Sequence, residues 1–293
     1  MLNFDWLATH ESYMDRCLQL AALGAGAVAP NPMVGAVLVH NDTIIGEGYH
    51  MQYGKAHAEV NCINNVPDEF RLLISKSTLY VSLEPCNHFG KTPPCSDLII
   101  KNNIPKVVVA CTDPFEKVNG SGIKKLKEAG IDVETGILEK EALELNRRFF
   151  TFHQKKRPYI ILKWAQSNDK KIANADLSSI AISNEYTNRL VHKWRSEEAA
   201  IVVGTRTALH DDPSLTTRLY PGKNPVRIVI DKDLKLPAHS KLLNNETETF
   251  VLNSIKEETT GNTHFHKIAE GADMVTATLN ILYQHQLTSL IVE

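Results

Sequence analysis

The sequence has no apolar run that approaches the ~20 residues needed for a membrane span. The first seven residues also lack the basic start and apolar stretch of a secretory signal, and they include Asp5. Cysteine is scarce, and without an export signal the five cysteines of the chain are expected to stay reduced rather than paired. We therefore expect a cytoplasmic protein that does not bind a membrane.

An excess of positive charge is absent as well. The 32 Lys and Arg residues are scattered along the chain and are outnumbered by 34 Asp and Glu residues, which gives a net charge of −2. Proteins that bind nucleic acid usually carry a basic patch or stripe, so we expect a small-molecule partner and no nucleic acid. Repeats and low-complexity tracts are also missing, and the 293 residues predict two globular domains of roughly 150 residues each.

Alternating helical and strand patterns predict a three-layer α/β domain in the first half of the chain. Apolar residues recur at helical spacing in residues 10–23, and two short strands flank the turn-forming pair Asn41 and Asp42. After this hairpin, helices are expected to begin near residue 57 and at residue 95, and to cover residues 122–129 and 139–153. Strands are expected at residues 78–83, 106–110 and 131–134.

The polar segment 154–158, which ends in Pro158, is the best candidate for a domain boundary. We therefore predict a first domain at residues 1–153 and a second at residues 158–293. Because the sequence ends on a strand without a closing turn or helix, the second domain is expected to be incomplete at its C-terminus. An open Rossmann-like sheet is predicted there from strand-like runs at residues 159–164, 199–203, 226–230, 249–252 and 289–292.

Three residues in the first half have the chemistry of a catalytic zinc site. Such sites have three protein ligands with nitrogen or sulfur donors and keep a fourth position for water. His57 opens a helix, Cys86 follows Pro85 at a strand end, and Cys95 begins a helix, where the dipole favours a thiolate. Glu59 is the expected proton shuttle between the water and a leaving amine. The pattern matches the H-x-E and P-C-x-x-C signature of zinc deaminases, except that eight residues separate the cysteines.

Other interpretations of these residues remain open. The triplet of residues 57–59 is common by chance and by itself indicates little more than a helix start. A structural zinc site would need a fourth protein ligand, for which His88 is available. A disulfide between Cys86 and Cys95 is disfavoured by the expected reducing compartment. The other cysteines are expected to be small core residues, namely Cys17, Cys62 and Cys111.

Several blocks of sequence together resemble the bacterial bifunctional deaminase/reductase family of riboflavin biosynthesis. In the first half these are Pro30-Asn31-Pro32-Met33-Val34-Gly35, His57-Ala58-Glu59, residues 84–95 and Asp113-Pro114. In the second half they include Lys163-Trp164-Ala165, residues 211–218 and Ile291-Val292-Glu293. The resemblance covers essentially the whole chain. It implies a cytidine-deaminase-like first domain and a dihydrofolate-reductase-like second domain.

The resemblance also implies substrates and cofactors. The family deaminates 2,5-diamino-6-ribosylamino-4(3H)-pyrimidinone 5′-phosphate with Zn²⁺, and then reduces the ribosyl group to ribityl with NADPH. A homo-oligomer formed through the second domain is implied as well. The residues implied for the deaminase substrate are Asn31, His50, His88 and Lys91. Those implied for the reductase substrate are Ser179, Arg195, Leu215, Arg218 and Glu293, and those for NADPH are Ala165, Thr207 and Asp211.

The sequence departs from the family pattern at three places. Lys170 ends a segment that is usually Ser-Leu-Asp-Gly, Ala181 stands where a Trp usually contacts the nicotinamide nucleotide, and Phe115-Glu116 replaces Asn-Pro in a DPNP block. Lys170 and Ala181, together with the expected incomplete C-terminus of the second domain, motivate an alternative in which only the deaminase is active and the second domain is a non-catalytic binding or scaffold module. A nucleic-acid editing or structural zinc protein is a third hypothesis, which the negative net charge disfavours.

Overall fold

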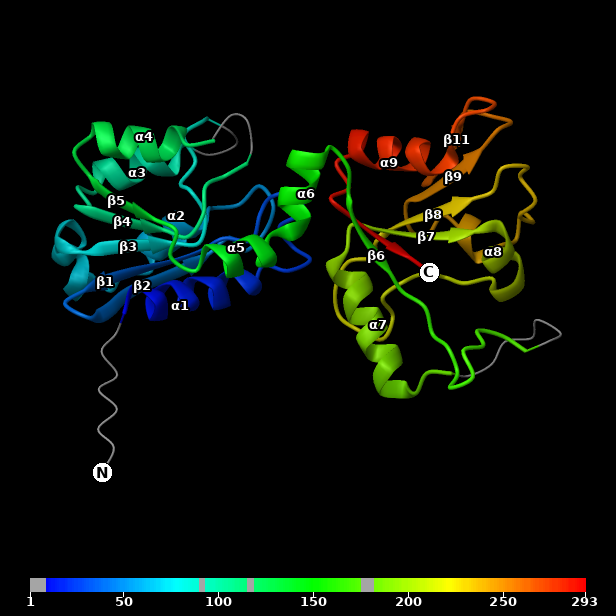
Figure 1. Cartoon of the computed structure of the whole chain (residues 1–293), viewed down its shortest axis with the longest axis horizontal. Coiled ribbons are helices and arrows are strands. Elements are labelled where there is room, and N and C mark those ends of the chain that lie inside the picture. The colour runs from blue at the N-terminus through cyan, green and yellow to red at the C-terminus, as the bar shows by residue number, and fades with distance from the viewer. Residues whose placement is uncertain (1–8, 90–92, 115–118, 175–181) are drawn as a thin grey trace. The chain divides into compact units, whose positions relative to one another are not determined.

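The computed structural model describes residues 9–89, 93–114, 119–174 and 182–293. The chain divides into two compact units, Met1–Gln154 and Lys155–Glu293, and each unit has its own sheet (Figure 1). Among the described residues, no helix is long and apolar enough to cross a membrane. Because each unit has its own sheet, the two units are described separately.

The first unit is built on a five-stranded sheet with the order β2-β1-β3-β4-β5. Strand β1 is antiparallel to both of its neighbours, whereas β3, β4 and β5 are parallel. The strands are β1 (Gly35–His40), β2 (Thr43–Tyr49), β3 (Thr78–Val81), β4 (Lys106–Val109) and β5 (Asp132–Thr135). The helices are α1 (His10–Ala22), α2 (Ala58–Asn64), α3 (Cys95–Lys101), α4 (Ser121–Glu128), α5 (Glu139–Leu145) and α6 (Arg147–Lys155), with the 3₁₀ helix η1 at Asp68–Lys76.

Successive strand residues of the first unit point into two different cores, because side chains alternate across a sheet. Tyr80 packs with residues of α1, α5 and α6 on one face, whereas Leu79 packs with residues of α2, α3 and α4 on the other. The predicted three-layer α/β fold is therefore confirmed. Cys17, Cys62 and Cys111 are at most 2% exposed, which confirms their expected place in the core.

The predicted helix over residues 139–153 is wrong in one respect, because the structure contains two helices that meet at Asn146. The Asn146 side chain accepts a hydrogen bond from Met33 N and donates one to Met33 O, both at 2.8 Å. The break between the two helices thus coincides with a contact between the Asn146 side chain and the main chain of a distant segment. This contact ties the α5–α6 junction to the segment that carries Asn31.

The second unit is built on a seven-stranded sheet with the order β10-β11-β9-β8-β7-β12-β6. All neighbouring strands are parallel except β10 and β11. The strands are β6 (Tyr159–Leu162), β7 (Ala200–Gly204), β8 (Val226–Ile230), β9 (Thr249–Asn253), β10 (Glu258–Thr260), β11 (Thr263–Lys267) and β12 (Ser289–Val292). The helices are α7 (Glu185–Glu197), α8 (Thr205–Asp211) and α9 (Met274–Gln284), with the 3₁₀ helix η2 at Lys241–Leu243.

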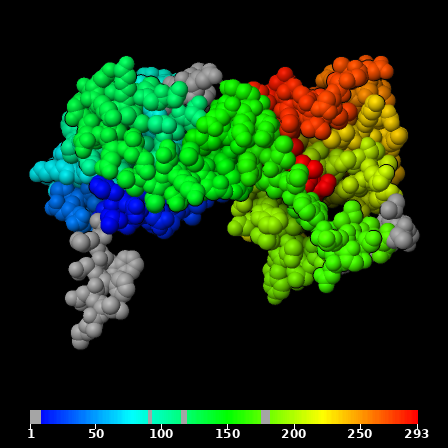
Figure 2. All heavy atoms as spheres, in the orientation of Figure 1, coloured from blue at the N-terminus to red at the C-terminus, as the bar shows by residue number. Residues whose placement is uncertain are grey.

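Both faces of the second sheet are covered, as the predicted Rossmann-like fold requires. Phe250 and Leu282 belong to the core beneath α9, whereas Val251 and Leu215 belong to the core beneath α8 and η2. Helices α7 and α9 are visible at the surface in Figure 2, as expected for helices that cover a sheet. The predicted open α/β fold is confirmed, although the β10–β11 hairpin was not predicted.

Arg227 is the largest fully buried side chain of the described residues, and it lies in β8. Among these residues it forms no ion pair, and its guanidinium instead donates to six neutral oxygen acceptors. Three of these acceptors are main-chain carbonyls of the segment that runs from η2 to Thr247. One side chain therefore holds β8, η2 and the following turn together. The acceptors are Ser214 O, Lys241 O, Leu242 O, Asn244 Oδ1, Thr247 O and Thr249 Oγ1.

We predict that Arg227→Met lowers the free energy of unfolding of the second unit by about 3 kcal/mol or more, because each buried acceptor left without a donor costs roughly 1–3 kcal/mol. Urea unfolding followed by the fluorescence of Trp164 and Trp194, both in this unit, measures the change. The control is Arg189→Met, which removes an exposed ion pair with Glu185 and should cost about 0.5 kcal/mol or less. Equal effects of the two substitutions would contradict the role given to Arg227.

Candidate active site

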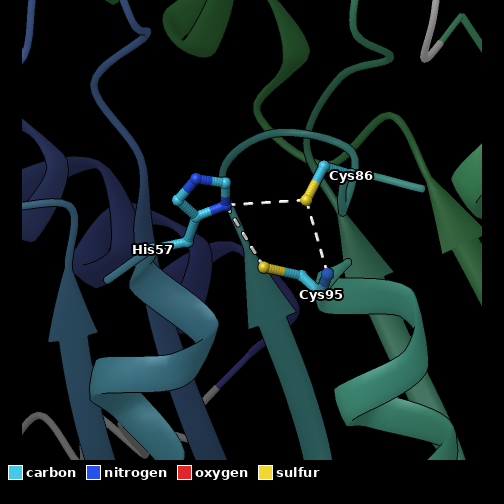
Figure 3. A group of neighbouring side chains, drawn as sticks. All are labelled: His57, Cys86 and Cys95. Carbon is cyan, nitrogen blue, oxygen red and sulfur yellow. Dashed lines mark hydrogen bonds between the residues drawn. The ribbon is translucent and has the colours of Figure 1, made fainter. Parts of the chain in front are cut away.

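Three potential metal ligands from separate segments meet in the first unit. His57 precedes α2, Cys95 is the first residue of α3, and Cys86 lies in the loop after β3 (Figure 3). His57 Nδ1 lies 3.5 Å from Cys86 Sγ and 3.4 Å from Cys95 Sγ, and the three ligand atoms lie within 4.8 Å of one another. One nitrogen and two sulfur donors match the ligand set of a catalytic zinc site. Within the described ranges, His88 and the carboxylates do not belong to this group.

Close packing determines where the first ligand lies. A Cβ placed on Gly48 of β2 would be 2.2 Å from Cys62 N, so α2 lies directly against the strand. Helices α2 and α3 also share one core, to which Ala58 and Ile99 contribute. Because packed interiors deform little, the starts of the two helices keep a fixed separation. The ligand geometry is thus a product of the core beneath it.

The electrostatics of the group favour a cation. Hydrogen bonds from Cys95 to its sulfur lower the pKa of Cys86 to about 4, so Cys86 is a thiolate at neutral pH. The bond to Cys86 raises the pKa of His57, and the same thiolate together with burial raises the pKa of Cys95. A thiolate is the form of cysteine that binds metal, and the proton of the partner thiol is released on binding. The residues present therefore fit a zinc ion.

Glu59 lies in the first turn of α2 and is only 3% exposed. It interacts with the side chain of Cys95, which places its carboxyl beside the metal ligands. Burial, together with the charge of Cys86, raises the pKa of this carboxyl. A carboxyl whose pKa moves toward neutrality can both accept a proton and give it back.

Asn31 and His50 lie beside the metal ligands, since the His50 ring packs edge-on against His57 at 5.4 Å. His50 Nδ1 lies 3.0 Å from Ala56 O, and because a carbonyl only accepts, this nitrogen carries the proton. His50 Nε2 then accepts from Asn31 Nδ2 at 3.1 Å. Burial lowers the pKa of His50, which favours this neutral form. The arrangement leaves Asn31 Oδ1 as a hydrogen-bond acceptor for a ligand.

The loop between the two cysteine ligands is only partly described. His88 is half-buried in this loop, and Lys91 lies outside the described residues.

The five cysteines are all free, so the disulfide considered for Cys86 and Cys95 is not formed. Asp113 of the DPNP-like block is buried, whereas Phe115 and Glu116 lie outside the described residues.

The second unit brings together Arg195 and Glu293, which are 98 residues apart in sequence. Arg195 Nη2 donates to Glu293 Oε2 at 2.8 Å, and Arg195 Nη1 donates to Thr216 O at 3.4 Å. Lys163 Nζ lies 3.5 Å from Glu293 Oε1. Within the described part of the chain, Arg195 Nε and Glu293 Oε1 are buried without a hydrogen-bond partner. Buried polar atoms are normally hydrogen-bonded, so among the described residues Arg195 Nε is left unsatisfied, whereas Glu293 Oε1 keeps its ion-pair contact with Lys163.

The other residues implied for the reductase substrate differ in their surroundings. Arg218 is exposed, and burial together with the charges of Arg195 and Arg218 lowers the pKa of His192, which places these groups near one another. Leu215 has a positive φ of 54°, and its side chain is 1% exposed and packs in the core. Ser179 lies outside the described residues, as does Ala181.

The residues implied for NADPH lie near strand ends. Ala165 follows the carboxyl end of β6, Thr207 lies in α8 directly after β7, and Asp211 is the exposed last residue of that helix. A Cβ placed on Gly204, the last residue of β7, would meet no atom within 4 Å. The space at this strand end is therefore open, and the carboxyl ends of strands are where open α/β sheets bind dinucleotides. These residues fit a dinucleotide.

Glu84, Lys163 and His192 also lie at these sites, although no role was predicted for them from the sequence. Glu84 and Lys163 belong to the blocks that carry the family resemblance, which is the signal that singles them out. His192 precedes Arg195 by three residues, a spacing that places both on one face of α7. A buried histidine next to an expected phosphate-binding arginine is therefore recognisable from helical spacing.

Comparisons with protein families match both units. The family described as the cytidine and deoxycytidylate deaminase zinc-binding region matches residues 7–111. The family described as the RibD C-terminal domain matches residues 158–293.

Individual relatives agree with these matches. The riboflavin biosynthesis protein RibD of Aquifex aeolicus is 45% identical over 84% of this chain and 68% of its own length. That of Bacillus amyloliquefaciens is 44% identical over 80% of this chain, and the match spans 62% of that protein's length. The crystal structure of a diaminohydroxyphosphoribosylaminopyrimidine deaminase/5-amino-6-(5-phosphoribosylamino)uracil reductase from Thermotoga maritima superposes with a TM-score of 0.88 and 38% identity, covering 97% of this chain and 80% of that one. The chain thus belongs to the RibD family of bifunctional riboflavin-biosynthesis enzymes, and it contains both the zinc-binding deaminase domain and the reductase domain of that family.

Proposed function

We propose that this chain catalyses two successive steps of riboflavin biosynthesis. The first is zinc-dependent hydrolytic deamination of 2,5-diamino-6-ribosylamino-4(3H)-pyrimidinone 5′-phosphate, carried out by a domain at residues 1–153. The second is NADPH-dependent reduction of the ribosyl group to ribityl, carried out by a domain at residues 158–293. The observation that carries the proposal is the group of His57, Cys86 and Cys95 with the buried carboxyl of Glu59 beside it.

In the deaminase step, His57, Cys86 and Cys95 hold the zinc ion. When bound, zinc supplies the Lewis acidity that makes water a nucleophile near neutral pH. Glu59 accepts a proton from the attacking water and gives it to the amine that leaves the pyrimidine, a task that suits a carboxyl with a raised pKa. The carbon therefore gains an oxygen and loses an ammonia molecule, and Glu59 ends the cycle in its initial state.

Hydrogen bonds orient the substrate in this step. The free Oδ1 of Asn31 accepts from an N–H group of the pyrimidine, and His50 holds the Asn31 amide in that orientation. We further propose that His88 and Lys91 contact the 5′-phosphate, since both side chains belong to the loop between the cysteine ligands. A cationic side chain such as that of Lys91 suits an anionic substrate.

In the reductase step, we propose that the forked guanidinium groups of Arg195 and Arg218 bind the substrate phosphate. Ser179, Glu293 and the backbone of Leu215 complete the substrate site, with Glu293 accepting from ribose hydroxyls. When bound, NADPH supplies the hydride that reduces the ribosyl carbon. Ala165, Thr207 and Asp211 are the proposed contacts of this cofactor, which the open space at Gly204 supports.

The compartment and assembly complete the proposal. We infer a cytoplasmic enzyme, since five free cysteines, two of them metal ligands, suit a reducing compartment.

We also infer a homo-oligomer formed through the second unit. Tyr186, Leu190 and Trp194 are 81%, 43% and 40% exposed and form an apolar stripe at four-residue spacing along α7. Exposed apolar stripes of this kind are typical of subunit interfaces.

We expect Glu59→Gln to retain one zinc ion per chain while lowering the deaminase kcat roughly 10²–10⁴-fold, because glutamine fills the same volume but cannot accept the proton. Elemental analysis measures the zinc, and the ammonia released from the pyrimidine substrate measures turnover. Glu128→Gln, at an exposed glutamate of the same unit, is the matched control. A near-normal rate for Glu59→Gln would remove this residue from the mechanism.

We expect Arg195→Ala to raise the reductase KM for the phosphorylated substrate roughly 10–100-fold, since a hydrogen bond to a charged group contributes about 1.5–3 kcal/mol. NADPH oxidation followed by absorbance gives KM, and Arg195→Lys should recover part of the loss. Deaminase activity of the same variant is the control, because Arg195 lies in the other unit. If the unaltered chain does not bind NADPH, the alternative of a non-catalytic second domain is favoured instead.

For the assembly, we expect the double substitution Tyr186→Glu with Leu190→Glu to reduce the molar mass measured by light scattering to that of a monomer. Two charges in an apolar interface would each remain desolvated and unpaired in the oligomer. Leu72→Glu, at a leucine that is 87% exposed in the first unit, should leave the mass unchanged. An unaltered chain that is monomeric at micromolar concentration would rule out the assembly.

A further inference from the structure

Glu84 carries a buried carboxylate two residues before the ligand Cys86, and it is only 3% exposed. Its Oε1 accepts from Gly122 N at 2.9 Å and from Ile123 N at 3.2 Å. Its Oε2 accepts from Gly120 N at 2.9 Å and from Asp113 N at 3.2 Å. One carboxylate thus satisfies four main-chain donors.

These donors come from two segments that are separate from the loop after β3, which carries Glu84. Asp113 follows β4, whereas Gly120, Gly122 and Ile123 form the start of α4. The main chain of Glu84 adds a further link, because Glu84 N donates to Cys111 O at 3.0 Å. Glu84 therefore ties the end of β4 and the start of α4 to the segment that enters the metal site.

The start of α4 in turn lies against both neighbours of Cys86. A Cβ placed on Gly122 would be 1.9 Å from Pro85 O, so the helix start and this peptide are in direct contact. On the other side of the ligand, Asn87 Nδ2 donates to Ser121 O at 3.4 Å. The position of α4 therefore limits where the Cys86 main chain can lie.

The start of α3 holds Cys86 from the opposite side. Ser96 N donates to Cys86 O at 3.1 Å, and Cys95 N donates to Cys86 Sγ at 3.3 Å. Cys86 is thus fixed between the starts of two helices. The α3 side is bonded to Cys86 directly, whereas the α4 side is held in place by the carboxylate of Glu84.

We propose that Glu84 is a positioning residue of the metal site, which fixes Cys86 by anchoring the start of α4 against the ligand loop. The inference rests on the proposed zinc-dependent function of the first unit. Groups that orient metal ligands without touching the metal typically change metal affinity about 10–100-fold when they are altered. Both oxygens of a carboxylate accept hydrogen bonds, whereas a glutamine amide would turn an NH₂ donor toward two of the four N–H groups.

The test measures zinc affinity of the full chain with Glu84→Gln, using Zn²⁺ alone and competition with a chromophoric chelator. We expect an affinity about 10–100-fold weaker than that of the unaltered chain. Cobalt substituted for zinc should show altered cysteine-to-metal absorption bands, which report ligand geometry and do not respond to a mere loss of stability. Glu84→Asp, which keeps a carboxylate on a shorter side chain, should lie between the two and replaces Glu84→Gln if that variant does not fold.

The matched control is Glu47→Gln in the same unit, which removes the Arg16 ion pair on β2 and should leave both measurements unchanged. Unchanged zinc affinity and cobalt bands in Glu84→Gln and Glu84→Asp would overturn the proposal, as would equal losses in Glu47→Gln. Failure of the proposed function gives a different result, namely an unaltered chain that binds zinc tightly but releases no ammonia from the pyrimidine substrate.

Discussion

The close approach of two sulfur atoms and one imidazole nitrogen is the constraint on which the first unit depends. Each atom comes from a different segment, and a cation can be bound only if the three segments bring their ligand atoms within a few ångströms of one another. The shared core beneath α2 and α3 fixes two of these segments. The third is a loop, and loops need polar contacts to hold one conformation, which is why a network of main-chain hydrogen bonds surrounds Cys86.

The second unit also combines an apolar core, which fixes the regular elements, with hydrogen bonds that fix the connecting segments. Apolar residues on both faces of the sheet fix the strands, and a single fully buried guanidinium holds the segments that connect them. In both units a buried charged side chain, Glu84 or Arg227, is thus hydrogen-bonded to neutral groups, most of them in the main chain, rather than to an opposite charge. Neutral partners of this kind are numerous and directional, so one side chain can order several turns of irregular backbone.

Much of this architecture follows from local sequence. The apolar runs that became β3, β4, β7 and β8 were predictable because strands buried on both faces need continuous apolar sequence. The β10–β11 hairpin was not, because β10 is exposed and β11 contains a single apolar residue, Phe265, so neither strand carries an apolar pattern. The contact of Asn146 with Met33, which accompanies the break between α5 and α6, joins residues 113 positions apart, and no local pattern can encode it.

Some residues of the metal site could likewise be predicted from the sequence, and others could not. His57, Cys86 and Cys95 were predictable because few residue types bind zinc, whereas the bonds of Glu84 are made to main-chain groups that every residue possesses.

The orientation of the Asn31 amide has a consequence for inhibitor selectivity. An asparagine that rotates freely offers a donor or an acceptor as the ligand requires, whereas this one is held by a histidine whose own proton is committed to Ala56 O. A pyrimidine analogue with a lone pair at the facing atom would set two acceptors against each other, and a buried mismatch of this kind costs far more than a lost methyl contact. In the binding mode proposed for Asn31, ring analogues that differ only in replacing that N–H by a bare nitrogen should therefore be poor ligands, however closely they match the substrate in shape.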